Sequence, residues 1–113
     1  LFRSIFAWLQ SCELPSIAFP VLEPELFGHK YAVTLNRNDQ ESLKLQAGQT
    51  PAYLNIITIP DDATEMTANI KAPIVINVNQ RIARQCVLQD NNLAIKEKIF
   101  TYCCCAAKTD YVH

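Results

Sequence analysis

The sequence predicts a small, mainly β domain of the sandwich or barrel class, with one short helix. Turn signals recur about every eight to twelve residues, which is the spacing of short strands in such folds. The segments between the turns are rich in β-branched and aromatic residues, which favour strands. The chain has 113 residues, of which 50% are hydrophobic and 19% charged, so a single globular core is feasible.

The N-terminal part of the chain predicts three strands. Residues 4–10 form the first strand and residues 17–22 the second. Pro20 marks an edge or a bulge in the second strand because proline cannot donate to the sheet. Residues 23–28 form a loop, and residues 31–35 form the third strand.

One segment shows the signals of a helix. Asn38 and Glu41 have the spacing of a capping box, in which each side chain bonds the backbone of the other. Leu43 and Ala47 follow at the i and i+4 positions of one helix face. Gly48 supplies a left-handed residue that ends the helix.

The second half of the chain returns to strands. Residues 53–59 are rich in β-branched side chains and predict a central strand. Residues 66–78 form the next extended segment, and a tight turn near Asn79 leads into a returning strand over residues 82–88. Residues 94–102 predict a last strand. We therefore expect one domain over residues 1–102, followed by a tail of uncertain order over residues 103–113.

Charge and hydropathy argue against two classes of partner. The net charge is −1 and the pI is about 6.1, whereas a nucleic-acid-binding domain usually carries a basic face, so we expect no direct nucleic-acid binding. Arg81 and Arg84 beside Lys71 are typical of a solvated surface. No window approaches the ~20 apolar residues of a membrane span, so we expect no membrane insertion.

Signals of catalysis and of cofactor binding are weak. Gly28 and Gly48 are the only glycines, so the chain has no glycine-rich phosphate loop. Asp61, Asp62 and Glu65 lie close together, but aspartates after a proline are ordinary turn residues. We therefore expect neither enzymatic activity nor a cofactor.

The cysteines predict reduced thiols rather than a metal site. Cys12 and Cys86 are isolated, and residues 103–105 are three adjacent cysteines, which suit neither a regular disulfide framework nor a C-x-x-C metal motif. Only two histidines accompany them. This pattern favours a cytoplasmic protein with reduced thiols and no metal.

A resemblance to a known family comes from several blocks of sequence. The segment TEMTANIKAPIVINVNQRIARQCVLQD resembles the hallmark of the bacterial flagellar assembly factor family, FliW, in which a Thr-Ala-Asn corner runs into an Ala-Pro-Ile strand. The upstream segments WLQSCELPSIAFPVLEPELFGHKYAVTL and AYLNIITIP resemble other blocks of that family. The blocks span about residues 4–95 in the family's order, which is more specific than any single motif.

The resemblance implies a compact, antiparallel β-barrel-like domain that acts by binding proteins rather than by catalysis. Members of the family bind flagellin and the RNA-binding regulator CsrA. Freed from exported flagellin, they bind CsrA away from its RNA-contacting surface and release the flagellin message for translation. The alternative is a β-rich peptide-binding module with an unrelated partner.

The resemblance also implies an incomplete sheet. The family carries N-terminal residues that supply leading strands before the segment that corresponds to Leu1. We therefore expect an exposed sheet edge near residues 4–10 or 17–22. Such an edge favours self-association by pairing with a neighbouring chain.

The contact residues are predicted from the alternation of strand faces. If Ile74 and Ile76 face the core, then Asn77 faces outward, near Arg84. The Thr67-Ala68-Asn69 corner is expected to hold its loop by side-chain-to-backbone hydrogen bonds. The predicted protein-binding residues form a first cluster at the corner and hairpin and a second one upstream; they are Met66, Asn69, Asn77, Arg84, Phe27 and Tyr31. The alternative is that this segment is scaffold.

Overall fold

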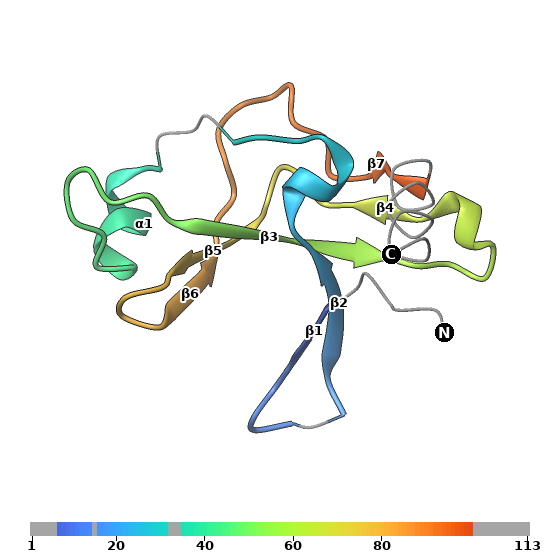
Figure 1. The fold of residues 1–113 in the computed structure, drawn as a ribbon, viewed down its shortest axis with the longest axis horizontal. Helices are drawn as coiled ribbons and strands as arrows, with labels where there is room; N and C mark the ends of the chain where they lie inside the picture. Colours follow the sequence, from blue (N-terminus) through green and yellow to red (C-terminus); the bar gives the residue numbers. More distant parts are fainter. Residues whose placement is uncertain (1–6, 15, 32–34, 101–113) are drawn as a thin grey trace, which may run out of the picture.

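The computed structural model describes residues 7–14, 16–31 and 35–100, and its main feature is an antiparallel sheet (Figure 1). The sheet contains seven strands in this part of the chain. One α-helix and two short 3₁₀ helices accompany the strands in the same residues. The prediction of a mainly β fold with one short α-helix is confirmed.

The strand β3 (Ala52–Thr58) is the centre of the sheet. It pairs with β2 (Ala18–Leu22), β4 (Thr67–Ala68) and β5 (Ile74–Asn77), in each case antiparallel. Its alternating buried residues and its isoleucines suit a strand with neighbours on both sides. The predicted central strand is therefore confirmed, with each bound shifted by one residue.

Three further strands end the sheet. The strand β1 (Ala7–Gln10) pairs with β2, β6 (Ile82–Gln85) pairs with β5, and β7 (Glu97–Lys98) pairs with β4. Among the described residues the sheet is open, because β1 and β7 lie at opposite ends of its order. The barrel-like description therefore holds only loosely. In the order of the described strands β1 is terminal, as the prediction of an edge near residues 4–10 requires. Residues 4–6 of that segment lie outside the described residues.

Pro20 lies inside β2 without breaking a ladder hydrogen bond. The amide of Ser11 donates to the carbonyl of Ile17, and this sets the register so that Trp8 and Pro20 form a non-hydrogen-bonded pair. The nitrogen of Pro20 therefore points away from β1, toward the side on which pairing with β3 begins one residue later. This is the edge position that the sequence predicts.

The helix α1 (Arg37–Ser42) begins earlier than predicted. Its N-cap is Asn36, whose side-chain oxygen accepts a hydrogen bond of 2.8 Å from the amide of Asp39. The predicted capping box at Asn38 is wrong because Asn36 offers the same acceptor two residues earlier, and because Asp39 then occupies the first turn, where a carboxylate is favourable.

The helix also ends before Gly48. The amide of Lys44 donates to the carbonyl of Glu41, and the amide of Leu45 donates to the carbonyl of Gln40, which is the Schellman pattern. Lys44 has the left-handed φ of 54° that this pattern requires. Gly48 has a φ of 79° but lies in the loop that follows. The prediction of a helix reaching Gly48 is wrong.

The strand β5 presents to the core the face opposite to the predicted one. Val75 and Asn77 are fully buried, whereas Ile74 and Ile76 are half-buried. The prediction that Ile74 and Ile76 point inward is therefore wrong. Asn77 occupies a core position because four hydrogen bonds satisfy its side chain, as described below.

Several predicted elements are shorter than expected or are helical. The returning strand after the turn is confirmed as β6, and the turn places Arg81, rather than Asn79, at positive φ. The last strand is only β7; its predicted end at residues 101–102 lies outside the described residues. The 3₁₀ helices η1 (Pro24–Phe27) and η2 (Ala63–Glu65) replace a predicted loop and a turn.

Two other predictions fall largely on residues that the structure does not describe. Of the third strand, over residues 31–35, the described ends Tyr31 and Leu35 are not in a strand, and residues 32–34 lie outside the described part. The tail over residues 103–113 lies outside it as well.

The core consists of two neighbouring clusters. One contains Leu22, Ile57 and Ile99, and the other contains Leu43 and Val75. The side chains of Tyr31 and Leu93 pack against both clusters and join them. In the described part of the chain, no helix is both long and apolar enough to cross a membrane.

Candidate functional site

A chain of hydrogen bonds holds the Thr67-Ala68-Asn69 corner against β3. The side-chain amide of Asn55 donates to the hydroxyl of Tyr31 at 2.7 Å and to the carbonyl of Asn69 at 2.9 Å. The hydroxyl of Tyr31 donates to the carbonyl of Ile70 at 2.6 Å. The side chain of Asn69 accepts from the amide of Ala72 at 3.0 Å, which confirms the predicted side-chain-to-backbone bond at this corner.

Tyr31 is the centre of this arrangement. Burial raises the pKa of its hydroxyl to about 12, although the hydrogen bond from Asn55 acts in the opposite direction. The ring of His29 meets it edge-on with centroids 4.4 Å apart, and the ring of Tyr53 lies 4.6 Å away. A neutral phenol within an aromatic group is a structural element that positions the corner.

A second hydrogen-bond network joins the β5–β6 hairpin to the end of α1. The side-chain amide of Asn77 donates to the carbonyls of Leu43 at 2.8 Å and Lys44 at 3.2 Å. Its oxygen accepts from the side chain of Gln49 at 2.8 Å and from the amide of Gln80 at 3.3 Å. Asn77 therefore links the β5–β6 turn to the end of α1 and to the loop before β3.

The structure does not bring the predicted contact residues together on one surface. Phe27 and Met66 are buried in the same core cluster, and Asn77 is fully buried. The premise that Asn77 faces outward is wrong, because β5 presents the opposite face to solvent. Arg84 is the exposed member of the first cluster, with 54% of its side chain accessible. The binding roles of these residues stay predictions.

Arg84 is anchored rather than freely extended. Its Nε donates to the carboxylate of Asp39 at 3.2 Å, and 11% of the Asp39 side chain is exposed. The pair joins β6 to the first turn of α1. An accessible guanidinium held in one place is a suitable contact group for a partner protein.

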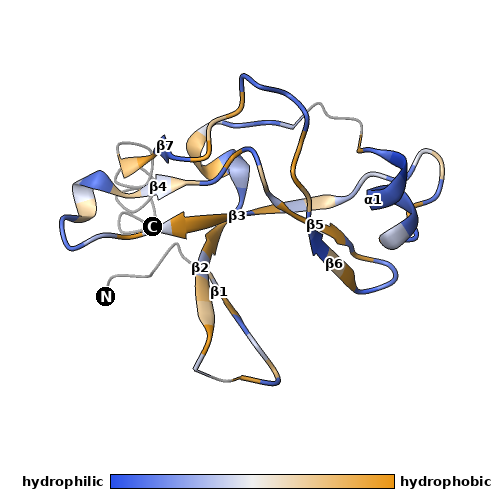
Figure 2. Ribbon diagram, turned by 180° about the vertical axis from the view of Figure 1, so that it is seen from behind, coloured by the Kyte–Doolittle hydropathy of each residue, from blue (hydrophilic) through white to orange (hydrophobic). Residues whose placement is uncertain are grey.

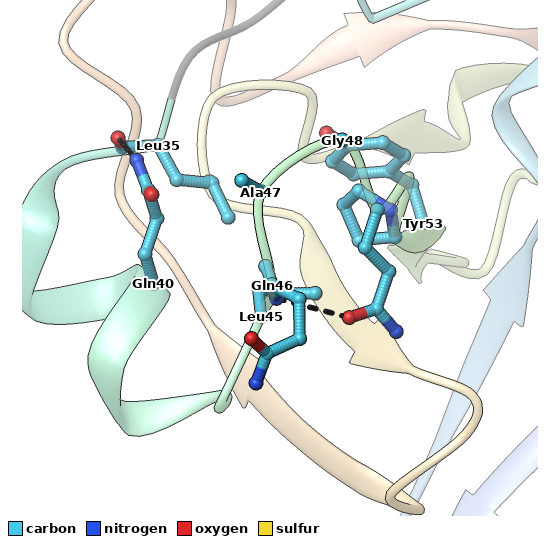
Figure 3. Close-up of a pocket in the computed structure, with 9 residues that line it drawn as sticks. Leu35, Gln40, Leu45, Gln46, Ala47, Gly48 and Tyr53 are labelled. Atoms are coloured by element: carbon cyan, nitrogen blue, oxygen red, sulfur yellow. Dashed lines mark hydrogen bonds between the residues drawn. The ribbon is translucent and has the colours of Figure 1, made fainter.

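The pocket in Figure 3 lies between α1, the loop that follows it and the start of β3. It has a volume of about 340 Å³, and its apolar walls include Leu35, Leu45 and Tyr53. Two of its polar side chains are already bonded within the fold, since Gln40 donates to the carbonyl of Leu35 and Gln49 accepts from the amide of Gln46. These bonds brace the pocket and leave few groups to orient a small ligand.

The described residues hold no group of three or more His, Cys, Asp or Glu side chains placed to bind a metal ion. Cys12 is exposed and Cys86 is buried, both as free thiols. Burial, reinforced by Asp39, raises the pKa of the Cys86 thiol to about 11. Residues 103–105, the adjacent cysteines, lie outside the described residues.

The sequence predicts an exposed backbone edge at the β1–β2 hairpin, but not the apolar surface that the hairpin carries. It projects from β3 (Figure 1) and exposes large apolar side chains on both of its faces. Trp8 is 61% exposed on one face, and Phe19 is 46% exposed on the other, beside Leu9. Leu14 and Ile17 add to this surface at the hairpin end. A cluster of exposed apolar residues on a projecting element marks a surface for protein contact.

Comparisons with known proteins agree with one another. The FliW protein family model matches residues 2–99. A flagellar assembly factor FliW of Bdellovibrio bacteriovorus is 67% identical over 97 residues, which are 86% of this chain and 55% of that protein. A flagellar assembly factor FliW of Clostridium tetani is 38% identical over 87% of this chain and 68% of its own length. The chain thus spans about half the length of the first of these relatives.

The fold has a counterpart among solved structures. A crystal structure of the flagellar assembly factor FliW superposes with a TM-score of 0.76 at 35% sequence identity. The match covers 85% of this chain and 68% of that one.

Proposed function

The chain belongs to the FliW family of flagellar assembly factors, and we propose that it acts in the cytoplasm as a partner switch that binds flagellin and antagonises the translational regulator CsrA. In this function it binds proteins and performs no catalysis, and it needs no cofactor. Flagellin in the cell occupies the factor. Export of flagellin frees the factor to bind CsrA, which then releases the flagellin message.

The switch requires that the two partners weaken each other's binding. They need not share a surface, because a negative coupling free energy between two sites has the same effect and acts equally in both directions. A coupling of about 1–3 kcal/mol changes each affinity about 5- to 150-fold. Binding of flagellin then lowers the affinity for CsrA by the same factor as CsrA lowers the affinity for flagellin.

The observation that supports the proposal best is the projecting β1–β2 hairpin. Its exposed apolar side chains include a tryptophan, one of the residue types enriched among the residues that contribute most to protein interfaces. The hairpin is joined to the rest of the sheet through Val21 and Leu22, which pair with β3 and are buried. A contact surface on two paired strands needs less ordering when a partner binds than one on an unpaired loop does.

The test is retention of purified flagellin and CsrA from the same organism by the immobilised chain. We expect both proteins to be retained separately, and excess flagellin to reduce the amount of CsrA retained. Trp8→Ser is expected to weaken binding of at least one partner about tenfold or more, which corresponds to about 1.4 kcal/mol.

Val78→Ser is the matched control. Val78 lies in the β5–β6 turn and is 63% exposed, close to the 61% of Trp8, so it tests loss of an exposed apolar side chain elsewhere. We expect this variant to bind as the unchanged chain does. Retention of neither partner would overturn the proposal and would favour a peptide-binding module with an unrelated partner.

A further inference from the structure

The central strands have a second apolar face that neither core cluster uses. Alternate residues of β3 and β5 point away from the core, and the register places Ala52 opposite Ile76 and Leu54 opposite Ile74. All four side chains are half-buried, and none belongs to either core cluster. Figure 2 shows hydrophobic segments along β2 and β3 on this sheet. We call these four residues the outer face.

A groove lies at one border of the outer face. Ala52, Leu54 and Ile76 line it together with Glu23 and Glu25, and its volume is about 490 Å³. The sheet register explains why the carboxylates are there. Leu22 pairs with Asn55, so Glu23, the next residue after β2, is carried alongside Leu54. The chain then turns into η1, whose first turn carries Glu25. We call this site the outer groove.

The two carboxylates of the outer groove have no cationic partner among the described residues. Glu23 and Glu25 are both exposed. The ion pairs in this part of the chain join Arg84 to Asp39 and Lys98 to Glu65. Two unpaired carboxylates beside an apolar floor produce a local negative potential, which salt screens because both side chains are exposed.

We propose that the outer groove binds a segment of a partner protein in which a Lys or Arg lies next to a large apolar side chain. The apolar side chain covers Leu54 and Ile76, and the cation reaches Glu23 and Glu25. The negative rim repels phosphate groups, so the groove suits neither a nucleic acid nor an anionic lipid headgroup. This inference rests on the proposed function, in that the chain acts by binding proteins.

The probes are two fluorescein-labelled peptides of equal length that repeat Leu-Lys-Ser or Leu-Glu-Ser. Fluorescence anisotropy measures their affinity for the whole chain. We expect the lysine peptide to bind at least tenfold more tightly than the glutamate peptide. Rising salt is expected to lower the affinity of the lysine peptide, because salt screens the attraction between its lysines and the two carboxylates.

Three variants locate the binding. Glu23→Gln combined with Glu25→Gln is expected to weaken binding of the lysine peptide about tenfold, because it removes both negative charges. The variant is expected to stay folded, because exposed positions tolerate this change. Glu23→Lys combined with Glu25→Lys is expected to reverse the preference, so that the glutamate peptide binds more tightly. Glu41→Gln, an exposed glutamate on α1, is the control and is expected to change nothing.

The proposal is overturned if the two peptides bind equally, or if the Glu41 variant weakens binding as much as the groove variants do. Retention of flagellin and CsrA is measured on the same variants. If both proteins are retained but the peptides show no preference, the proposed function stands and the groove is wrong. If the peptides behave as expected and neither protein is retained, the groove stands and the proposed function fails.

Discussion

The side-chain amide of Asn55 donates a hydrogen bond to the hydroxyl of Tyr31 at 2.7 Å, and that hydroxyl donates in turn to the carbonyl of Ile70 at 2.6 Å. Asn55 is fully buried at the middle of the central strand, so the corner is fastened to the strand that contacts the largest number of other strands in the described sheet. Both bonds are donated by the side-chain amide, whereas the buried side-chain oxygen of Asn55 has no hydrogen-bond partner among the described residues, so the amide alone fixes the corner.

Asn55→Ala is therefore expected to lower the free energy of unfolding by about 2–4 kcal/mol, because it removes two hydrogen bonds at a buried position and leaves the carbonyl of Asn69 without that donor. Urea denaturation followed by circular dichroism measures the change. The control is Asn91→Ala, which removes an exposed asparagine and is expected to stay within about 0.5 kcal/mol. Equal effects of the two substitutions would show that the network contributes nothing.

The N-cap of α1 gives a second prediction. Asn36→Ala is expected to cost about 1 kcal/mol because the amide of Asp39 loses its acceptor. Asn38→Ala, two residues away and exposed within the helix, is the matched control and is expected to change stability by less than about 0.5 kcal/mol. Thermal or urea unfolding of both variants measures the difference. A larger loss at Asn38 would restore the capping box predicted from the sequence.

The existence of this helix was predictable, but its ends were not. Two asparagines stand two residues apart, and each is a favourable N-cap, so local preference alone does not choose between Asn36 and Asn38. Leu43 is fully buried against Val75, and this packing sets where the helix lies. The left-handed residue at its end is Lys44, a type that rarely takes this conformation, so no sequence signal marked it.

The faces of β5 show the same limit. Alternation predicts that Ile74 and Ile76 share one face and Val75 and Asn77 the other, which is correct. Hydrophobicity then favours the isoleucine face as the core face. The structure buries the other face because Gln49 and the end of α1 satisfy Asn77, and these partners lie far away in the sequence. The outer groove was missed for the same reason, since it exists only because the isoleucines face outward.

The pH dependence of stability is the third prediction. The pKa of Cys86 is raised from its ordinary 9.0 to about 11, and that of Tyr31 from 10.0 to about 12. Between the ordinary and the raised pKa of each group, the unfolded chain releases a proton that the folded chain retains. The contribution of these two groups to stability is therefore fully present below about pH 9 and is lost as the pH rises toward 11 for Cys86 and 12 for Tyr31. Urea denaturation midpoints between pH 8 and pH 11 measure this fall.

Cys86→Val separates the contribution of the thiol, because valine fills a similar volume and does not titrate. We expect its stability to fall less steeply between pH 9 and 11 than that of the unchanged chain. The slope is compared rather than the absolute stability, so a small packing effect of the substitution does not matter. An identical slope in both proteins would show that the folded state does not hold the proton on Cys86.

The last prediction separates contact residues from scaffold among the residues proposed from the sequence. Met66→Ala is expected to cost about 2–5 kcal/mol of stability, because it leaves a cavity in the cluster that includes Phe27. Arg84→Ala is expected to weaken binding of CsrA or flagellin and to cost about 1–3 kcal/mol of stability, because it leaves the largely buried carboxylate of Asp39 without its cation. Calorimetric titration with each partner and melting temperatures are measured on the same samples.

Lys98→Ala is the matched control for Arg84, because Lys98 also pairs with a carboxylate, at 2.9 Å from Glu65, and is more exposed. It removes the same charge from a different part of the sheet, so a general charge effect would weaken binding equally in both variants. A loss of partner affinity that is specific to the Arg84 variant identifies β6, in the β5–β6 hairpin, as part of a contact surface. If Arg84→Ala leaves both affinities unchanged while Met66→Ala weakens binding only as far as it unfolds the chain, both residues are scaffold and the predicted surface is wrong.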